Sequence, residues 1–152
     1  MDSYAMCGIA GYCGPERRFS AEKLQRMLRA IEHRGPDDEG AYSAAAGDGN
    51  RVWLGSRRLA IQDLSPAGHQ PMVEPGSGNA IAFNGEIYNF LELREALARE
   101  GYAFRSRCDT EVALASWGRK GPGGVDEWRG MFAAALWDAR AEELWVVRDP
   151  WG

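Results

Sequence analysis

The sequence predicts a domain of the α+β class, in which short strands and amphipathic helices alternate without the strict βαβ repeat of a parallel sheet. Two further observations bound this prediction. The chain has 152 residues, which is about the length of one domain. Hydrophobic residues make up 45% of the chain and aromatic residues 11%, so the chain can form a core.

The first predicted elements are a strand and a helix. The string "CGIAGYC" (7–13) is typical of a strand. The helix is predicted from Ser20, whose side chain can cap it, to the Gly35-Pro36 pair that stops it. The apolar face of this helix consists of Leu24, Met27, Leu28 and Ile31.

The middle of the chain is predicted to hold two strands separated by a loop. Alternating apolar residues indicate a strand at 51–61. The next segment, "SPAGHQPM" (65–72), is a loop because it is rich in proline and glycine. The string "AIAFNG" (80–85) is a short apolar strand that ends in an Asn-Gly turn.

The C-terminal part is predicted to contain two helices and then two strands. The first helix begins at Asn89, which with Glu92 has the spacing of a capping box, and the second is capped by Asp109. A short strand at 102–106 separates the two helices. The final elements are strands at 131–138 and 143–150, joined by a polar turn at 139–142.

Charge and cysteine content exclude several classes of function. The formal net charge is −4 and no basic patch stands out, so we expect no nucleic-acid partner. No signal-peptide pattern is present and the longest apolar run, "MFAAALW", is too short to cross a bilayer, so we expect no membrane partner and a cytoplasmic location. Three cysteines without a Cys-x-x-Cys pair, and only two histidines, argue against a disulfide framework and a metal site.

Three polar features are weak signals when each is taken alone. Arg58 ends a predicted strand and is typical of a surface arginine. The string "NGEIYN" (84–89) is typical of a turn, and "CDTEV" (108–112) is typical of a helix cap. Their order along the chain is more specific than any one of them.

A series of uncommon strings occurs in one order over nearly the whole chain: "MCGIAGY", "HRGPDDEG", "RLAIQDL", "GHQPM", "FNGEIYN", "CDTEV", "GMFAAALWD" and "RDPWG". In this combination the chain closely resembles the glutamine amidotransferase domain of the class II, or N-terminal nucleophile, type. The amino-terminal domains of glutamine-hydrolysing asparagine synthetases are the nearest in appearance. The resemblance covers Cys7 to Gly152 and implies a four-layer αββα sandwich, with two mostly antiparallel sheets between helices.

The resemblance implies that Cys7 is the nucleophile that attacks the side-chain amide of glutamine, and that its own α-amino group is the base. An α-amino group has a reference pKa of about 7.7–8.0, so it is partly neutral near pH 7 and can accept the thiol proton. The side chain of Asn84 and the backbone N–H of Gly85 would stabilise the oxyanion. The string "HRGPD" (33–37) is either part of the site floor and ammonia exit or a plain turn that ends a helix.

The same resemblance implies how the amino-acid end of glutamine is bound. Arg58 would pair with the α-carboxylate, because a guanidinium can form two parallel hydrogen bonds to it. Glu86 and Asp109 would bind the ammonium group, and the backbone around Ile61 would add a contact. No metal and no cofactor is expected in this chain, and ATP and Mg are expected only on a partner synthetase.

Two features depart from the family pattern. Residues 1–6, "MDSYAM", stand before Cys7, and a peptide bond to them would convert the amine that serves as base into an amide. We expect one of three cases: these residues are removed, translation begins at Met6, or the domain is catalytically silent. Residues 7–152 make up the amidotransferase domain, with no synthetase domain, and it stays open whether the sandwich is complete at its C-terminal end. We therefore expect an ATP-dependent synthetase domain or subunit as partner, with aspartate as the default ammonia acceptor. A second copy of the chain is a further candidate partner.

Two other functions stay open at this point. The first is a non-catalytic amidotransferase-like scaffold or glutamine-sensing module, and the second is a hydrolase of another amide. The presence of Cys7 together with Asn84 favours catalysis over a scaffold. The presence of Arg58 together with the two acidic residues favours glutamine over another amide.

Overall fold

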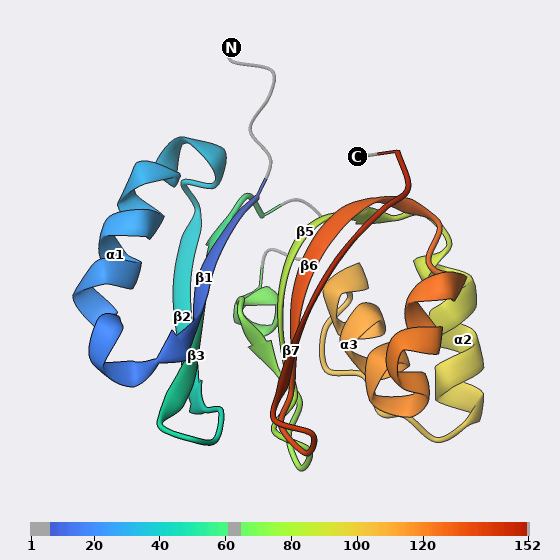
Figure 1. Cartoon of the computed structure of the whole chain (residues 1–152). Helices are drawn as coiled ribbons and strands as arrows, with labels where there is room; N and C mark the ends of the chain where they lie inside the picture. The colour runs from blue at the N-terminus through green and yellow to red at the C-terminus, as the bar shows by residue number, and fades with distance from the viewer. Residues whose placement is uncertain (1–6, 61–64, 152) are drawn as a thin grey trace.

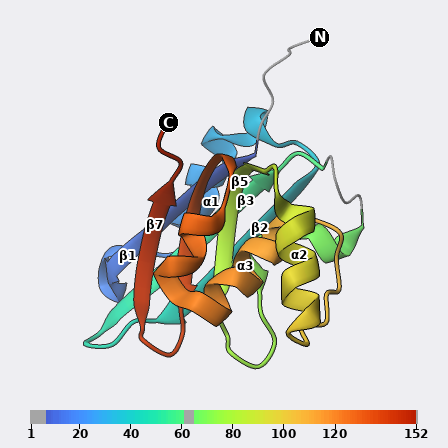
Figure 2. The same cartoon turned by 90° about the vertical axis from the view of Figure 1, so that its right-hand side faces the viewer.

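The computed structural model of the protein describes residues 7–60 and 65–151, which form two antiparallel sheets packed face to face between helices (Figure 1). Helix α1 (Ala21–Ala30) covers the outer face of the first sheet. Helices α2 (Phe90–Arg99) and α3 (Asp109–Lys120) lie side by side over the outer face of the second sheet, as Figure 2 shows from their side. The predicted four-layer αββα sandwich is therefore confirmed.

The strand order is β1-β3-β2 in the first sheet and β4-β5-β6-β7 in the second, and neighbouring strands are antiparallel. The first sheet consists of β1 (Gly8–Pro15), β2 (Asp38–Ala45) and β3 (Asn50–Arg58). The second consists of β4 (Met72–Val73), β5 (Ala80–Ile87), β6 (Gly130–Asp138) and β7 (Glu143–Arg148). Short 3₁₀ helices occupy Glu16–Arg18, Glu32–Arg34, Pro66–Gly68 and Gly121–Glu127.

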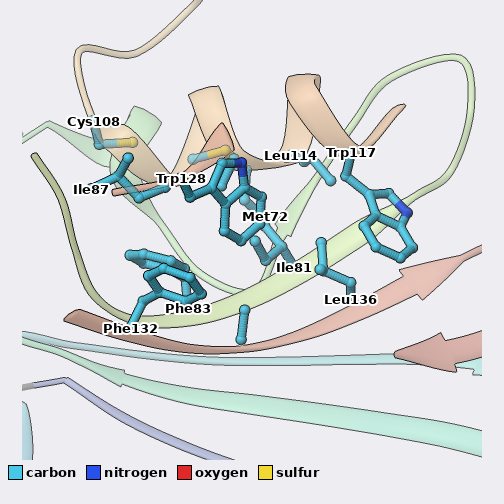
Figure 3. Close-up of a cluster of buried hydrophobic side chains, with 12 residues drawn as sticks. Met72, Ile81, Phe83, Ile87, Cys108, Leu114, Trp117, Trp128, Phe132 and Leu136 are labelled. Atoms are coloured by element: carbon cyan, nitrogen blue, oxygen red, sulfur yellow. The ribbon is translucent and has the colours of Figure 1, made fainter. Parts of the chain in front are cut away.

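Two apolar clusters hold the inner layers together. The larger lies between the second sheet and α3 and includes Ile81 and Phe83 of β5 and Leu114 of α3 (Figure 3). The buried members of the cluster between the two sheets are Val52, Leu54, Ala80, Ala82 and Trp137. Burial of these side chains supplies the main driving force for stacking the layers. Within the described residues, no helix is both long and apolar enough to cross a membrane.

A glycine lets α1 pack closely on the first sheet. Leu24 and Leu28 of α1 are fully buried. Both point at Gly55 of β3, where an added Cβ would lie 2.9 Å from a methyl carbon of Leu28. The predicted apolar face of this helix is therefore the face that packs against the first sheet.

Two of the predictions about strands are wrong, and one strand was not predicted. The Asn-Gly pair at 84–85 is not a turn, because β5 continues through it to Ile87 and pairs with β6 along its length. Segment 102–106 contains no strand. Strand β2 was not predicted, because its sequence "DEGAYSAA" has few of the β-branched and apolar residues that mark a strand.

The predicted side-chain caps are also wrong. Ser20 and Asn89 occupy N-cap positions, but neither side chain bonds to a backbone N–H of its helix. Asn89 instead joins the start of α2 to the segment before β6, because its Oδ1 accepts a hydrogen bond of 2.9 Å from the N–H of Arg129. The N-cap of α3 is Cys108, and Asp109 is the first residue of the helix. Asp109 is therefore available for contacts outside its own helix.

Candidate functional site

The side chains that point between the two sheets change from apolar to polar toward one end of the sandwich. Successive side chains of a strand point to opposite faces of its sheet. On β3, the row that begins with Val52 and Leu54 in the inter-sheet core continues to Ser56 and Arg58, and all four are buried. The inward row of the first sheet thus ends in a buried cation.

The facing strand of the second sheet shows the same change. On β5, the row that begins with Ala80 and Ala82 in the inter-sheet core continues to Asn84 and Glu86. The two strands pack against each other, and their polar ends lie at the end of the sandwich where β1 begins and β7 ends (Figure 1). The polar side chains of two sheets therefore meet at one edge of the molecule.

Cys7 lies at this same end, directly before β1. The register of β1 and β3 places it opposite Arg58 when it is extended by one residue. The N–H of Leu59 donates a hydrogen bond to Cys7 Sγ at 3.4 Å. Arg34 Nε donates to the carbonyl oxygen of Cys7 at 3.3 Å. The thiol and the backbone of Cys7 are therefore each held by a separate contact.

The string "HRGPD" (33–37) is a turn that ends the first helical segment and also anchors the strand beside Cys7. Arg57 Nε donates to the carbonyl oxygen of Gly35 at 3.0 Å, and Asp37 Oδ2 accepts from the N–H of Ala60 at 2.9 Å. An added Cβ at Gly35 would lie 2.5 Å from the Arg57 carbonyl group, so only glycine permits this approach. The structure therefore confirms that this string is a turn that ends a helix, while its part in the site floor and ammonia exit stays a prediction.

Arg58 is buried although it carries a charge, with only 8% of its surface exposed. Its guanidinium lies against the backbone of Gly68, where an added Cβ would be within 2.2 Å of Nη2. A side chain at position 68 would therefore displace the guanidinium. A buried guanidinium at the end of the inter-sheet core is suited to binding a carboxylate.

Asn84 and Gly85 lie next to each other on β5, opposite Ala133 and Phe132 of β6. The Oδ1 atom of Asn84 is buried and has no hydrogen-bond partner among the described residues. Gly85 has φ of +144°, and an added Cβ would lie 2.1 Å from the carbonyl oxygen of Met131, so the position requires glycine. This short segment therefore combines an unusual backbone with a carboxamide that can still bind a ligand.

Asp109 and Glu86 form an acidic pair at the same end. Asp109 is buried, and its Oδ2 accepts a hydrogen bond of 2.9 Å from the N–H of Ile87. Burial raises the pKa of Asp109; hydrogen bonds from the N–H groups of Ile87 and Thr110 oppose this rise, and the negative charge of Glu86 adds to it. A bound cation would relieve both the burial cost and the repulsion between these two carboxylates.

The structure therefore gathers most of the predicted site residues at one end of the sandwich. They are Cys7, Arg58, Asn84, Gly85, Glu86 and Asp109. Ile61, predicted to contribute a backbone contact, lies outside the described residues. The roles of these residues in binding and catalysis stay predictions.

Two buried polar residues near this end have no role in the sequence-based predictions. Ser56 is fully buried, and its Oγ has no hydrogen-bond partner within the described part of the chain. Gln70 is 4% exposed and joins β5 to α3. The sequence signal for Gln70 is the string "GHQPM" (68–72), which contributes to the resemblance and otherwise predicts only a loop.

Comparison with known families and proteins agrees with this geometry. The profile of a family described as "Glutamine amidotransferase domain" matches residues 6–152. A putative glutamine-hydrolysing asparagine synthetase of Mycobacterium bovis is 39% identical over 97% of this chain, and asparagine synthetase 1 of Bacillus subtilis is 37% identical over 97%. An amidase, chry2, of Gibberella zeae is 33% identical over 97%.

This chain spans only about a quarter of these relatives, between 23% and 24% of their lengths. Among solved structures, glutamine phosphoribosylpyrophosphate amidotransferase of B. subtilis, complexed with ADP and GMP, superposes with a TM-score of 0.71 at 20% identity. The alignment covers 95% of this chain and 37% of that one. At this identity the likeness supports the fold, and the family match supports the assignment: the chain belongs to the family of glutamine amidotransferase domains.

Proposed function

We propose that this domain hydrolyses the side-chain amide of glutamine through a cysteinyl thioester on Cys7 and passes the ammonia to an amide-forming synthetase. The observation that carries the proposal is the convergence, at one end of the sandwich, of a thiol, a buried guanidinium and a pair of carboxylates. A free amino acid presents a carboxylate and an ammonium group, which these charges complement. The match to the amidotransferase family selects glutamine among amino acids.

In the proposed complex, Arg58 pairs with the α-carboxylate, and Asp109 and Glu86 bind the α-ammonium group. Arg58 is well suited because its guanidinium is already buried and held against Gly68, so little ordering is required on binding. Fixing both charged ends of glutamine directs its side-chain amide toward Cys7. Such positioning is itself a large part of catalysis.

The proposed chemistry begins with transfer of the thiol proton of Cys7 to its own α-amino group. The sulfur attacks the amide carbon, and the carbonyl electron pair moves onto oxygen, where Asn84 and the N–H of Gly85 stabilise the charge. The tetrahedral intermediate then collapses, the C–N bond breaks, and nitrogen leaves as ammonia with the proton carried by the α-ammonium group. Water, deprotonated by the same amine, hydrolyses the thioester to glutamate and regenerates the thiol.

The ammonia acceptor is proposed from the relatives. Several carry the name glutamine-hydrolysing asparagine synthetase, and this domain makes up about 24% of their length. We propose a synthetase domain or subunit of this type as partner, with ATP and Mg bound there. Aspartate is then the first acceptor to test.

Replacement of Cys7 tests the proposal, and Cys13 provides a matched control. Both cysteines are free, and Cys13 is exposed on β1. In a chain that begins at residue 7, Cys7→Ala should lower glutamate release from glutamine by roughly 10³ or more, because the covalent route is lost. Cys13→Ala should leave the rate unchanged.

Near-equal rates for the wild-type chain and Cys7→Ala would contradict the role of Cys7. A wild-type chain that binds glutamine without hydrolysing it would instead support a sensing module. Thermal unfolding of each variant shows whether a lost rate comes from a lost fold.

A further inference from the structure

Gln70 connects β5 and α3, two of the elements that carry the proposed glutamine site. Its Oε1 accepts a hydrogen bond of 2.7 Å from the N–H of Phe83, the residue before Asn84. Its Nε2 donates a hydrogen bond of 3.2 Å to Oγ1 of Thr110, the residue after Asp109. One buried carboxamide therefore contacts the immediate neighbours of two proposed site residues that lie on different elements.

The side chain of Gln70 continues the edge of the second sheet. Strand β4 has only two residues, and Met72 pairs with Ile81. Extended backwards, this register places Gln70 opposite Phe83, where the Gln70 side chain accepts the N–H of Phe83. The middle of β5 is therefore held by a side chain that also reaches α3, which a backbone partner could not do.

The backbone of Gln70 lies close to the other sheet. An added Cβ at Gly40 of β2 would lie 2.0 Å from the carbonyl oxygen of Gln70, so this glycine permits close contact between strand and loop. The backbone of Gln70 thus lies against β2, while its side chain is hydrogen-bonded to β5 and α3. Gln70 therefore contacts both sheets and a helix.

We propose that Gln70 is a positioning residue that sets the separation between Asn84 and Asp109 in the glutamine site. Glutamine would contact Asp109 through its ammonium group and Asn84 through its reacting amide, so the distance between these residues must match the length of the substrate. A carboxamide suits this task because it offers one acceptor and two donors at a fixed spacing. This inference rests on the proposed glutaminase function.

The two hydrogen bonds of Gln70 have separable effects. Thr110→Val removes only the contact to α3, beside the ammonium-binding Asp109, so it should raise KM for glutamine about tenfold with little change in kcat. Gln70→Met removes both contacts, so it should also lower kcat about tenfold through Asn84. Thr110→Ser keeps the hydroxyl group and should restore the wild-type KM.

Asn79 offers a matched control at the opposite end of β5. It is buried just before β5, and its Oδ1 accepts a hydrogen bond of 3.0 Å from the N–H of Ala139 at the end far from the site. Asn79→Leu should lower Tm, because it removes a hydrogen bond between a buried carboxamide and a backbone N–H as Gln70→Met does, but it should leave KM and kcat unchanged.

The measurements are steady-state glutamate release and thermal unfolding for the four variants and the wild-type chain. The inference is supported if Thr110→Val changes KM alone, Gln70→Met changes both KM and kcat, and Thr110→Ser has the wild-type KM. It is overturned if Thr110→Val and Gln70→Met match Asn79→Leu in both kinetic constants. If Gln70→Met does not fold, the comparison of Thr110→Val with Thr110→Ser still decides. A wild-type chain without glutaminase activity would overturn the proposed function itself.

Discussion

Arg57 and Arg58 show how strand alternation gives two neighbouring residues different tasks. Both are buried, with 7% and 8% of their surfaces exposed. Arg57 points to the outer face of its sheet, where it meets the carbonyl oxygen of Gly35 and forms ion pairs with Glu32 and Glu39. Arg58 points between the sheets and ends the inward row at the candidate site.

We expect Arg58→Lys to raise KM for glutamine by about tenfold or more, because the ammonium group of lysine cannot form the two parallel hydrogen bonds of a guanidinium to a carboxylate. Arg57→Lys is the matched control. It should lower Tm with a much smaller effect on KM, since Arg57 contacts other residues of the protein on the outer face of the sheet. Steady-state kinetics and thermal unfolding of both variants provide the comparison. The same KM for Arg58→Lys and the wild-type chain would show that Arg58 is only structural.

The raised pKa of Asp109 makes the free energy of unfolding depend on pH. Burial raises its pKa above the ordinary value of 3.8, so over a range of pH above 3.8 the folded chain keeps a proton that the unfolded chain has released. The stability that this carboxyl contributes is therefore fully present below pH 3.8 and is lost as the pH rises through its folded-state pKa. In the protein without a bound ligand, the ionised carboxylate of Asp109 therefore lowers the free energy of unfolding.

Asp109→Asn should therefore stabilise the protein at neutral pH and weaken its binding of glutamine. The amide oxygen can still accept the N–H of Ile87, while the buried charge is gone. The free energy of unfolding of the wild-type chain, relative to the variant, should fall as the pH rises from below 3.8 to neutral. Denaturant unfolding at several pH values measures this difference. A difference independent of pH would show that Asp109 titrates alike in the folded and unfolded chains.

At the scale of elements, the strongly patterned segments were predicted correctly. Helix α1 and strand β3 follow apolar periodicity that the sequence shows directly, and β1 and the β6–β7 hairpin follow from strand-like strings and a polar turn. The local sequence led to a wrong prediction where a tertiary contact determines the backbone conformation. Asn84-Gly85 has the composition of a turn, yet pairing with β6 keeps it in a strand whose glycine is required by a nearby carbonyl group.

The residues of the candidate site could be predicted from the sequence, but the residues that hold them in place could not. Cys7 and Arg58 could be identified because the strings around them resemble those of a known family. Gln70 could not be assigned a role, because its partners, Phe83 and Thr110, are distant in the sequence and meet it only through tertiary packing. Ser20 and Asn89 show the reverse case, in which a correct cap position did not predict the contact made.

At the scale of the whole molecule, the site depends on the stacking of the two sheets. The first sheet supplies Cys7 and Arg58, and the second supplies Asn84 and Glu86, while the apolar cluster between the sheets sets their separation. The α-amine of Cys7 is the base in the proposed mechanism. The central claim therefore requires that residues 1–6 are absent from the active protein.

The most direct test compares two chains whose N-termini have been verified by intact mass, one that begins at Cys7 and one that retains residues 1–6. Glutamate release from glutamine is measured for both. The first should be active, and the second should be slower by a factor on the order of 10² to 10⁴, because an amide nitrogen cannot accept the thiol proton. Equal rates would contradict the account, since Cys7 would then use a base other than its own amine.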